Sequence, residues 1–192
     1  MGSSKLQGVR IAILVSDGFE ELELLEPRQA FDRDGAATFV VSPAKNKVVG
    51  MNQEHGKKEV PVDIPLRTAR PEDFHALFLP GGGRNVEHLV KNSKAVQFAE
   101  DFVVASKPVA AIGEGIAVLI PGGTLRNRKV TCPVFLQEAL RKEGAGSVDQ
   151  DVVCDSTLIT ARGLEDISAF THAVTRILAD LRSHSSEMRR SA

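Results

Sequence analysis

The chain has 192 residues, enough for one well-buried domain and few for two. Hydrophobic residues make up 42% and charged residues 26% of the chain, which is an ordinary composition for a globular protein, and the net charge is -1. No overall field therefore draws the chain to nucleic acid or to a membrane, and we predict neither as a partner. Cys132 and Cys154 are too few for a disulfide framework, and no apolar run approaches the roughly 18 residues of a membrane span. These features predict a cytoplasmic protein.

The first half of the chain alternates buried strands with helical segments. The pattern predicts a strand over 9–15 and then a helix from Glu20 to Asp34, which Pro27 should kink or restart. Further strands are predicted over 38–42 and 76–79, with an antiparallel excursion over 45–63 between them, and an amphipathic helix over 93–105.

The second half continues this alternation. It predicts a strand that turns sharply into a helix over 107–120, a short strand over 129–131, a helix over 135–143 closed by Gly144, a hairpin over 152–160 and a closing helix over 164–181. We therefore expect a disordered start or tag remnant over 1–8, a single domain over 9–182 and a polar tail over 183–192. The predicted fold is α/β, a doubly wound and mostly parallel sheet with helices on both faces. Its reactive site should lie at the carboxyl ends of the strands.

The most informative segment is the sharp corner inside 107–120. An apolar run leads into Gly113-Glu114-Gly115, and a second apolar run follows to Ile120. This pattern is typical of a nucleophile elbow, whose corner residue takes a strained conformation with its side chain over the amino end of a helix. The corner residue here is Gly113, which has no side chain. The sequence thus predicts a scaffold for covalent catalysis that lacks its reactive atom.

Five segments carry a wider pattern: 19–24 (FEELEL), 79–82 (LPGG) with Glu87, 107–112 (KPVAAI), 128–131 (RKVT) and 158–163 (LITARG). In this order they resemble the ThiJ/PfpI superfamily of PfpI-like intracellular proteases and deglycase-like proteins. The resemblance spans about residues 9–181. It implies a flavodoxin-like fold, similar to that of class I glutamine amidotransferases, and a homodimer or a higher homo-oligomer.

In PfpI-like proteins the elbow typically reads Ile-Cys-His-Gly. The cysteine is the nucleophile, a glutamate of the first helix accepts or shares its proton, and an acid from a neighbouring subunit orients the histidine. By resemblance, Gly113 takes the place of the cysteine, Glu114 that of the histidine, Glu23 that of the glutamate and Glu87 that of the subunit-crossing acid. The backbone N–H groups of Gly82 and Glu114 would be the oxyanion donors.

The substituted elbow leaves several interpretations open. Gly113 cannot attack a carbonyl carbon, so the peptidase, amidase, aldehyde and deglycation chemistry of the family should fail there. Glu114 either complements the helix dipole or pairs with Glu23 as an acid and base on a bound water or carbonyl, in which case one apparent pKa of the pair is raised. A cluster of Glu20, Glu23, Glu87 and Glu114 could instead hold a divalent cation. The histidines show no metal-ligand spacing, and we predict neither a metal nor another cofactor.

Two further features belong to the predicted pocket. Gly81 and Gly82 should bring backbone N–H groups close to the elbow as part of an oxyanion or anion site, since no phosphate-loop frame fits them. Cys132 follows a segment that lines the pocket in the resembling family. Its thiol is either a displaced nucleophile or redox sensor, or a small buried apolar side chain.

Three hypotheses of function follow. The first is a pseudoenzyme that binds a small ligand or serves a stress-related role. The second is an enzyme that uses Glu23 and Glu114 in acid–base catalysis on small carbonyl compounds, as a hydrolase or lyase. The third is that Gly113 replaces the cysteine of a parent hydrolase, peptidase or deglycase.

Overall fold

The computed structural model describes residues 4–51 and 57–190, and its centre is a seven-stranded sheet. The strand order is β10-β11-β7-β6-β1-β2-β5, and every neighbouring pair is parallel except β10 with β11. The strands are β1 (Arg10–Leu14), β2 (Ala37–Ser42), β5 (Ile64–Pro65), β6 (Ala76–Leu79), β7 (Val109–Ile112), β10 (Val152–Asp155) and β11 (Leu158–Ala161). The predicted doubly wound α/β fold is confirmed.

The central strands are buried on both faces because helices cover each side of the sheet. In β1 the side chains of Ile11 and Ile13 enter one hydrophobic core, and those of Ala12 and Leu14 enter the other. Successive residues of a strand point to opposite faces, so a continuous apolar run is what a sheet covered on both sides requires.

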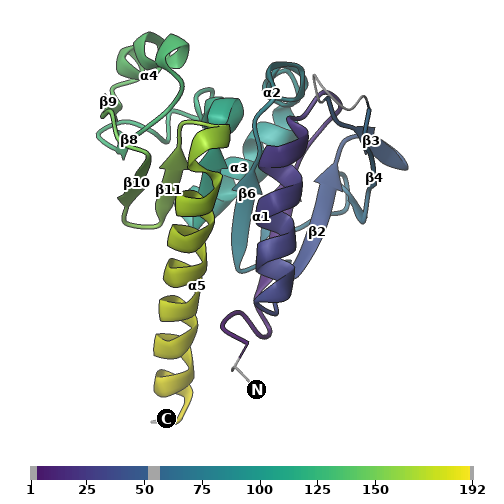
Figure 1. The fold of residues 1–192 in the computed structure, drawn as a ribbon, viewed down its shortest axis with the longest axis vertical. Coiled ribbons are helices and arrows are strands. Elements are labelled where there is room, and N and C mark those ends of the chain that lie inside the picture. Colours follow the sequence, from purple (N-terminus) through teal and green to yellow (C-terminus); the bar gives the residue numbers. More distant parts are fainter. Residues whose placement is uncertain (1–3, 52–56, 191–192) are drawn as a thin grey trace.

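Helices α1 (Glu21–Arg33) and α5 (Ile167–Arg190) lie on the face turned toward the viewer in Figure 1, and α2 (Gly83–Val90) and α3 (Ser93–Val104) lie behind the sheet. The carboxyl ends of the parallel strands are at the top of this view, and both chain termini are at the bottom. The remaining elements are the antiparallel pair β3 (Lys47–Val49) and β4 (Glu59–Pro61), the parallel pair β8 (Lys129–Val130) and β9 (Gly146–Ser147), the helix α4 (Gln137–Lys142), and the short 3₁₀ turns η1 (Pro71–Asp73), η3 (Val134–Leu136) and η4 (Leu164–Asp166).

The two ends of the chain differ from the prediction. The segment 4–8 belongs to the fold: Leu6 is fully buried in the core under α1 and α5, and its N–H donates to the carbonyl of Asp34. Residues 1–3 and 191–192 lie outside the described part. At the other end α5 continues to Arg190, so the segment expected as a polar tail extends the closing helix. The polar composition of this segment suggested a tail. An established helix can nevertheless extend through polar residues, because each added residue contributes one more backbone hydrogen bond.

Two local predictions are corrected. Helix α1 neither stops nor restarts at Pro27, which lies inside it and is buried. A proline supplies no N–H to the carbonyl four residues earlier, which here belongs to Glu23. The segment after the elbow is a 3₁₀ helix, η2 (Gly113–Leu119), rather than the predicted helix of α type. It contains Gly113 and Gly115, and glycine is a poor α-helix former.

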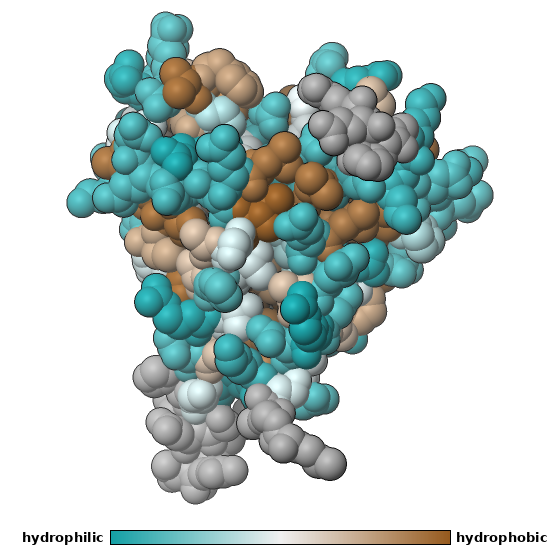
Figure 2. Space-filling view, in the orientation of Figure 1, coloured by the Kyte–Doolittle hydropathy of each residue, from teal (hydrophilic) through white to brown (hydrophobic). Residues whose placement is uncertain are grey.

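The face formed by α1 and α5 is mostly hydrophilic, with apolar side chains gathered between the upper ends of the two helices (Figure 2). Exposed apolar residues at these ends include Leu22 in the first turn of α1 and Leu164 just before α5. Among the described residues, none of the helices combines the length and the hydropathy that crossing a bilayer requires.

Candidate functional site: a carboxylate pair at an empty elbow

The elbow forms as predicted between β7 and η2. Strand β7 ends at Ile112, and Gly113 turns the chain with a φ of +58°, in the left-handed region that side chains rarely adopt. Gly113 is buried. A Cβ atom at this position would lie 2.7 Å from Oε1 and 2.8 Å from Oε2 of Glu23. The carboxyl group of Glu23 thus lies next to the position that the Cβ atom of a nucleophilic residue would occupy.

Glu23 reaches this position from the first turn of α1. Its side chain is buried, with 4% of the residue exposed, and its Oε2 accepts a hydrogen bond of 2.9 Å from the N–H of Gly81. Gly163, just after β11, also borders the carboxyl group, since a Cβ there would lie 3.5 Å from Oε1. Three strand ends therefore surround Glu23: those of β6, β7 and β11.

Glu114 approaches the same point from the first turn of η2. Its Oε2 accepts a hydrogen bond of 3.2 Å from the N–H of Gly82. A Cβ on Gly81 would collide with Oε2 of Glu23 and would lie 2.9 Å from Oε2 of Glu114. The structure therefore brings the two predicted carboxyl groups together, and only glycine at position 81 leaves room for both.

The closeness of these groups alters how Glu23 ionises. Burial is the main cause that raises the pKa of Glu23 from 4.5 to about 8, and the charge of Glu114 raises it further, while the hydrogen bond from Gly81 opposes the shift. Burial also raises the pKa of Glu20, with a smaller contribution from Glu114. The pair can therefore hold a proton at neutral pH, as two like charges at short distance require.

Two of the backbone donors expected at an oxyanion or anion site, those of Gly81 and Gly82, already have partners. The N–H of Gly81 donates to Glu23 and the N–H of Gly82 donates to Glu114. A developing oxyanion needs donors aimed at it and free to bond. At this elbow the Glu114 carboxyl group occupies the position next to the Gly82 N–H that a substrate oxygen would need.

The other two residues of the predicted site lie apart from this pair. Glu87 is on the exposed side of α2, where it forms an ion pair of 2.5 Å with Lys91 that lowers the pKa of its carboxyl group. Cys132 is buried in the core behind the sheet, 3.9 Å from the hydroxyl of Ser147, and burial raises the pKa of its thiol. A raised pKa disfavours the thiolate, so this environment favours the structural interpretation of Cys132.

Asn85, on α2, is a residue that the sequence analysis missed. Its side chain is fully buried; Oδ1 accepts from the N–H of Ser16 at 2.7 Å, and Nδ2 donates to the carbonyls of Pro80 and Gly81 at 3.0 and 3.1 Å. The sequence feature that could have indicated its burial is its position four residues before the buried Leu89, which places both residues on the inner side of a short helix. Asn85 thereby fixes the loop whose N–H groups bind Glu23 and Glu114.

Replacing this amide will destabilise the chain. Asn85→Ala removes the side-chain partner of the Ser16 N–H and of the Pro80 carbonyl, while the Gly81 carbonyl keeps the N–H of Glu20, and we expect the free energy of unfolding to fall by about 2 kcal/mol. Urea unfolding followed by circular dichroism measures the change. Glu87→Ala, on the exposed side of the same helix, is the matched control, and an equal loss in both variants would contradict the structural role of Asn85.

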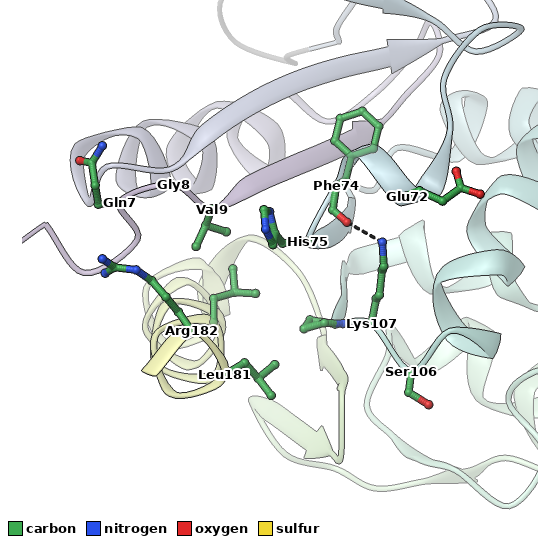
Figure 3. Close-up of a pocket in the computed structure, with 12 residues that line it drawn as sticks. Gln7, Gly8, Val9, Glu72, Phe74, His75, Ser106, Lys107, Leu181 and Arg182 are labelled. Atoms are coloured by element: carbon green, nitrogen blue, oxygen red, sulfur yellow. Dashed lines mark hydrogen bonds between the residues drawn. The ribbon is translucent and has the colours of Figure 1, made fainter. Parts of the chain in front are cut away.

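The site is distinct from the cavity drawn in Figure 3. That cavity has a volume of about 510 Å³ and lies at the opposite edge of the sheet, where Val9, His75 and Pro108 directly precede β1, β6 and β7. Lys107 borders it and donates to the carbonyls of Pro71 and Phe74 at 2.8 and 2.7 Å. Among the side chains that the structure describes, no three of His, Cys, Asp or Glu are grouped as metal ligands would be.

A parallel α/β sheet with a strand-turn-helix corner over a buried glutamate defines a protein of the nucleophile-elbow class. Residues 9–177 match the model of the DJ-1/PfpI family, and the chain belongs to that family.

Similar proteins include named deglycases. The chain is 34% identical over 170 residues to a deglycase of Thermococcus kodakarensis, covering 88% of this chain and 99% of that protein. It is 33% identical over 172 residues to protein/nucleic acid deglycase 2 of Escherichia coli, covering 88% and 97%. Among solved structures, a cysteine-to-alanine variant of a DJ-1 superfamily protein from Salmonella typhimurium superposes with a TM-score of 0.79 at 26% identity, covering 94% of this chain and 98% of that one.

Proposed function

We propose that this chain is a DJ-1/PfpI family protein without cysteine-dependent chemistry, and that its Glu23–Glu114 pair binds a small polar ligand noncovalently. One observation carries the proposal: the corner residue is Gly113, and the Glu23 carboxyl group lies against the space in which a nucleophile would begin. No atom at the corner can form a bond to substrate. In triad enzymes, loss of the nucleophile leaves only about 10³- to 10⁴-fold acceleration over water.

The chemistry of the pair indicates which ligands fit. Two carboxyl groups that share one proton present several acceptor oxygen atoms and one O–H donor, so they accept hydrogen bonds from hydroxyl, amino or ammonium groups and can donate one in return. An anionic ligand would meet like charge in a buried place and is disfavoured. A hydrated small carbonyl compound, which carries two hydroxyl donors on one carbon, matches these acceptors.

The proposal is tested by assaying turnover of methylglyoxal and release of a methylglyoxal-modified amine. We expect the wild-type protein to give no rate above a blank without protein, because the step that needs a covalent nucleophile has none. The Glu23→Gln variant is the control. Turnover by the wild type that is lost in this variant would contradict the proposal that the pair only binds its ligand.

That same outcome would support a second candidate, general acid–base catalysis on a small carbonyl compound. The observation in its favour is the pKa of about 8 at Glu23 beside a second carboxyl group. An acid of that pKa can exchange a proton with substrate near neutral pH. We place this candidate second because a backbone N–H already bonds one oxygen of each carboxyl group.

Self-association is part of the proposal. In the resembling family an acid from a neighbouring subunit completes the elbow, and here Glu87 is the residue at that position. Its exposure on α2 leaves it available to a second copy of the chain. If it approached the elbow there, it would add a third acidic group beside Glu23 and Glu114.

A further inference from the structure

A second cavity lies at the carboxyl ends of β2 and β5, on the side of the sheet covered by α3. Its volume is about 440 Å³. The polar residues that line it are Ser42, Lys45, Asn46, Arg67, Asn92 and Lys94, and the described lining includes no Asp or Glu. We call this feature the cationic pocket. It shares the upper edge of the sheet in Figure 1 with the elbow, but none of its lining residues belongs to the elbow.

The three cations of the cationic pocket come from separate segments. Lys45 belongs to the connection between β2 and β3, Arg67 follows β5, and Lys94 is in the first turn of α3. No ion pair joins any of the three to another described residue, whereas the nearby Lys47 pairs with Glu59 at 2.6 Å and Arg70 with Asp73 at 3.0 Å. Three positively charged residues therefore line one concave surface, and none of them forms an ion pair with a described acidic residue.

Asn92 adds a hydrogen-bond donor. Its Oδ1 caps α3 by accepting from the N–H groups of Lys94 and Ala95 at 3.1 and 3.2 Å. With the oxygen held in this way, the amide nitrogen is the end of the side chain left to face other partners. The cap also occupies these helix N–H groups, so the cations and the amide nitrogen, rather than the helix end, are the available donors.

Apolar side chains complete the lining. Pro65 and the buried Leu66 border the cavity, together with Pro43 and Ala44. A volume of 440 Å³ falls within the range of about 300 to 1,000 Å³ that is usual for small-molecule sites. The pocket can therefore take an organic group in addition to an anionic head.

We propose that the cationic pocket binds the phosphate monoester of a small organic molecule. A phosphate monoester carries about -1.5 to -2 charges at pH 7 and three strong acceptor oxygens. Lys45, Arg67 and Lys94 supply the matching charge, and Asn92 supplies a neutral donor. The sugar or carbon skeleton of the ligand packs on Pro65 and Leu66.

The test is a titration of the ¹⁵N-labelled chain with ribose 5-phosphate, inorganic phosphate and acetate at constant ionic strength, which holds charge screening fixed. We expect saturable shifts of the backbone amides of Lys45, Arg67 and Lys94, with ribose 5-phosphate binding more tightly than inorganic phosphate and acetate binding most weakly. Lys45→Gln and Arg67→Gln should each weaken binding of ribose 5-phosphate about fivefold.

Two matched controls separate a site from a general surface field. Lys47→Gln and Arg70→Gln remove the same charge from neighbouring positions that are already ion-paired, and they should leave the dissociation constant unchanged. Four outcomes would overturn the proposal: no saturable shift, equal weakening by the control variants, inorganic phosphate binding as tightly as ribose 5-phosphate, or acetate binding as tightly as either. All four substitutions are at exposed positions, so folding is not at stake.

Discussion

The Glu23→Gln variant will resist urea better than the wild-type chain at about pH 9 and will match it near about pH 4.5. The reason is the carboxyl group of Glu23, which is buried against the elbow and has a pKa of about 8 in the folded chain instead of 4.5. Glutamine keeps an oxygen for the N–H of Gly81 and carries no charge.

The sign follows from proton binding. Between pH 4.5 and about 8 the folded chain holds a proton on Glu23 that the unfolded chain has released. Stability therefore falls as the pH rises through this window, by at most about 1.4 kcal/mol per pH unit. The variant has no such proton, so it lacks this part of the pH dependence, and its unfolding free energy exceeds that of the wild type above the window.

Urea unfolding at several pH values measures the difference. Far-ultraviolet circular dichroism is the suitable signal, because the chain has no Trp or Tyr to report by fluorescence. Glu87→Gln is the control: its carboxyl group is exposed and has a lowered pKa, so any pH dependence from it falls below the window. Wild-type and Glu23→Gln curves that stay parallel from about pH 5 to 9 would show that Glu23 is not protonated in the folded chain.

The sequence predicted the layers of the fold and the position of the elbow, because both depend on local patterns. A continuous run such as 9–15 identifies a strand covered on two faces, and a glycine-rich corner between apolar runs identifies a strand that turns at its end. Gly113 and Glu114 could be named for the same reason, because they form the corner itself. Glu23 was assigned to the site by resemblance to PfpI-like proteins, and it lies at the carboxyl edge of the sheet as that resemblance implies.

The hydrogen bonds of the site could not be predicted in this way. The bonds from Gly81 to Glu23 and from Gly82 to Glu114 depend on which way two peptide groups of a loop point, and Asn85 sets that direction from a helix later in the chain. No spacing rule relates these residues. The burial of Leu6 and the continuity of α1 through Pro27 were likewise decided by tertiary packing, which overrides local propensity.

Gly113→Cys is expected to convert the elbow into a reactive site and to make the chain less stable. A side chain at a φ of +58° costs on the order of 1 kcal/mol. Its Cβ would also lie 2.7 Å from Oε1 of Glu23, so that carboxyl group must shift. We expect the free energy of unfolding to fall by about 1 to 2 kcal/mol, measured by urea unfolding near neutral pH.

Iodoacetamide labelling followed by peptide mapping measures the reactivity of the new thiol, and the chain supplies its own standards. Cys154 is exposed, whereas Cys132 is buried and has a raised pKa. The new thiol lies beside the protonated Glu23 and at the amino end of η2, and both favour a thiolate. We expect it to react about tenfold faster than Cys154 at neutral pH, and Cys132 to react slowest. A rate no greater than that of Cys154 would show that the pocket no longer stabilises a thiolate.

A thiol alone is not expected to give the chain deglycase activity, because the N–H of Gly82 is bonded to the Glu114 carboxyl group and is not free for a substrate oxygen. The double variant Gly113→Cys, Glu114→His removes that carboxyl group and provides the base that the family pattern places there. Since one oxyanion donor is worth about 10²-fold or more in turnover, the double variant should release a methylglyoxal-modified amine about 10² times faster than Gly113→Cys. Equal rates in the two variants would mean that Glu114 does not obstruct the elbow.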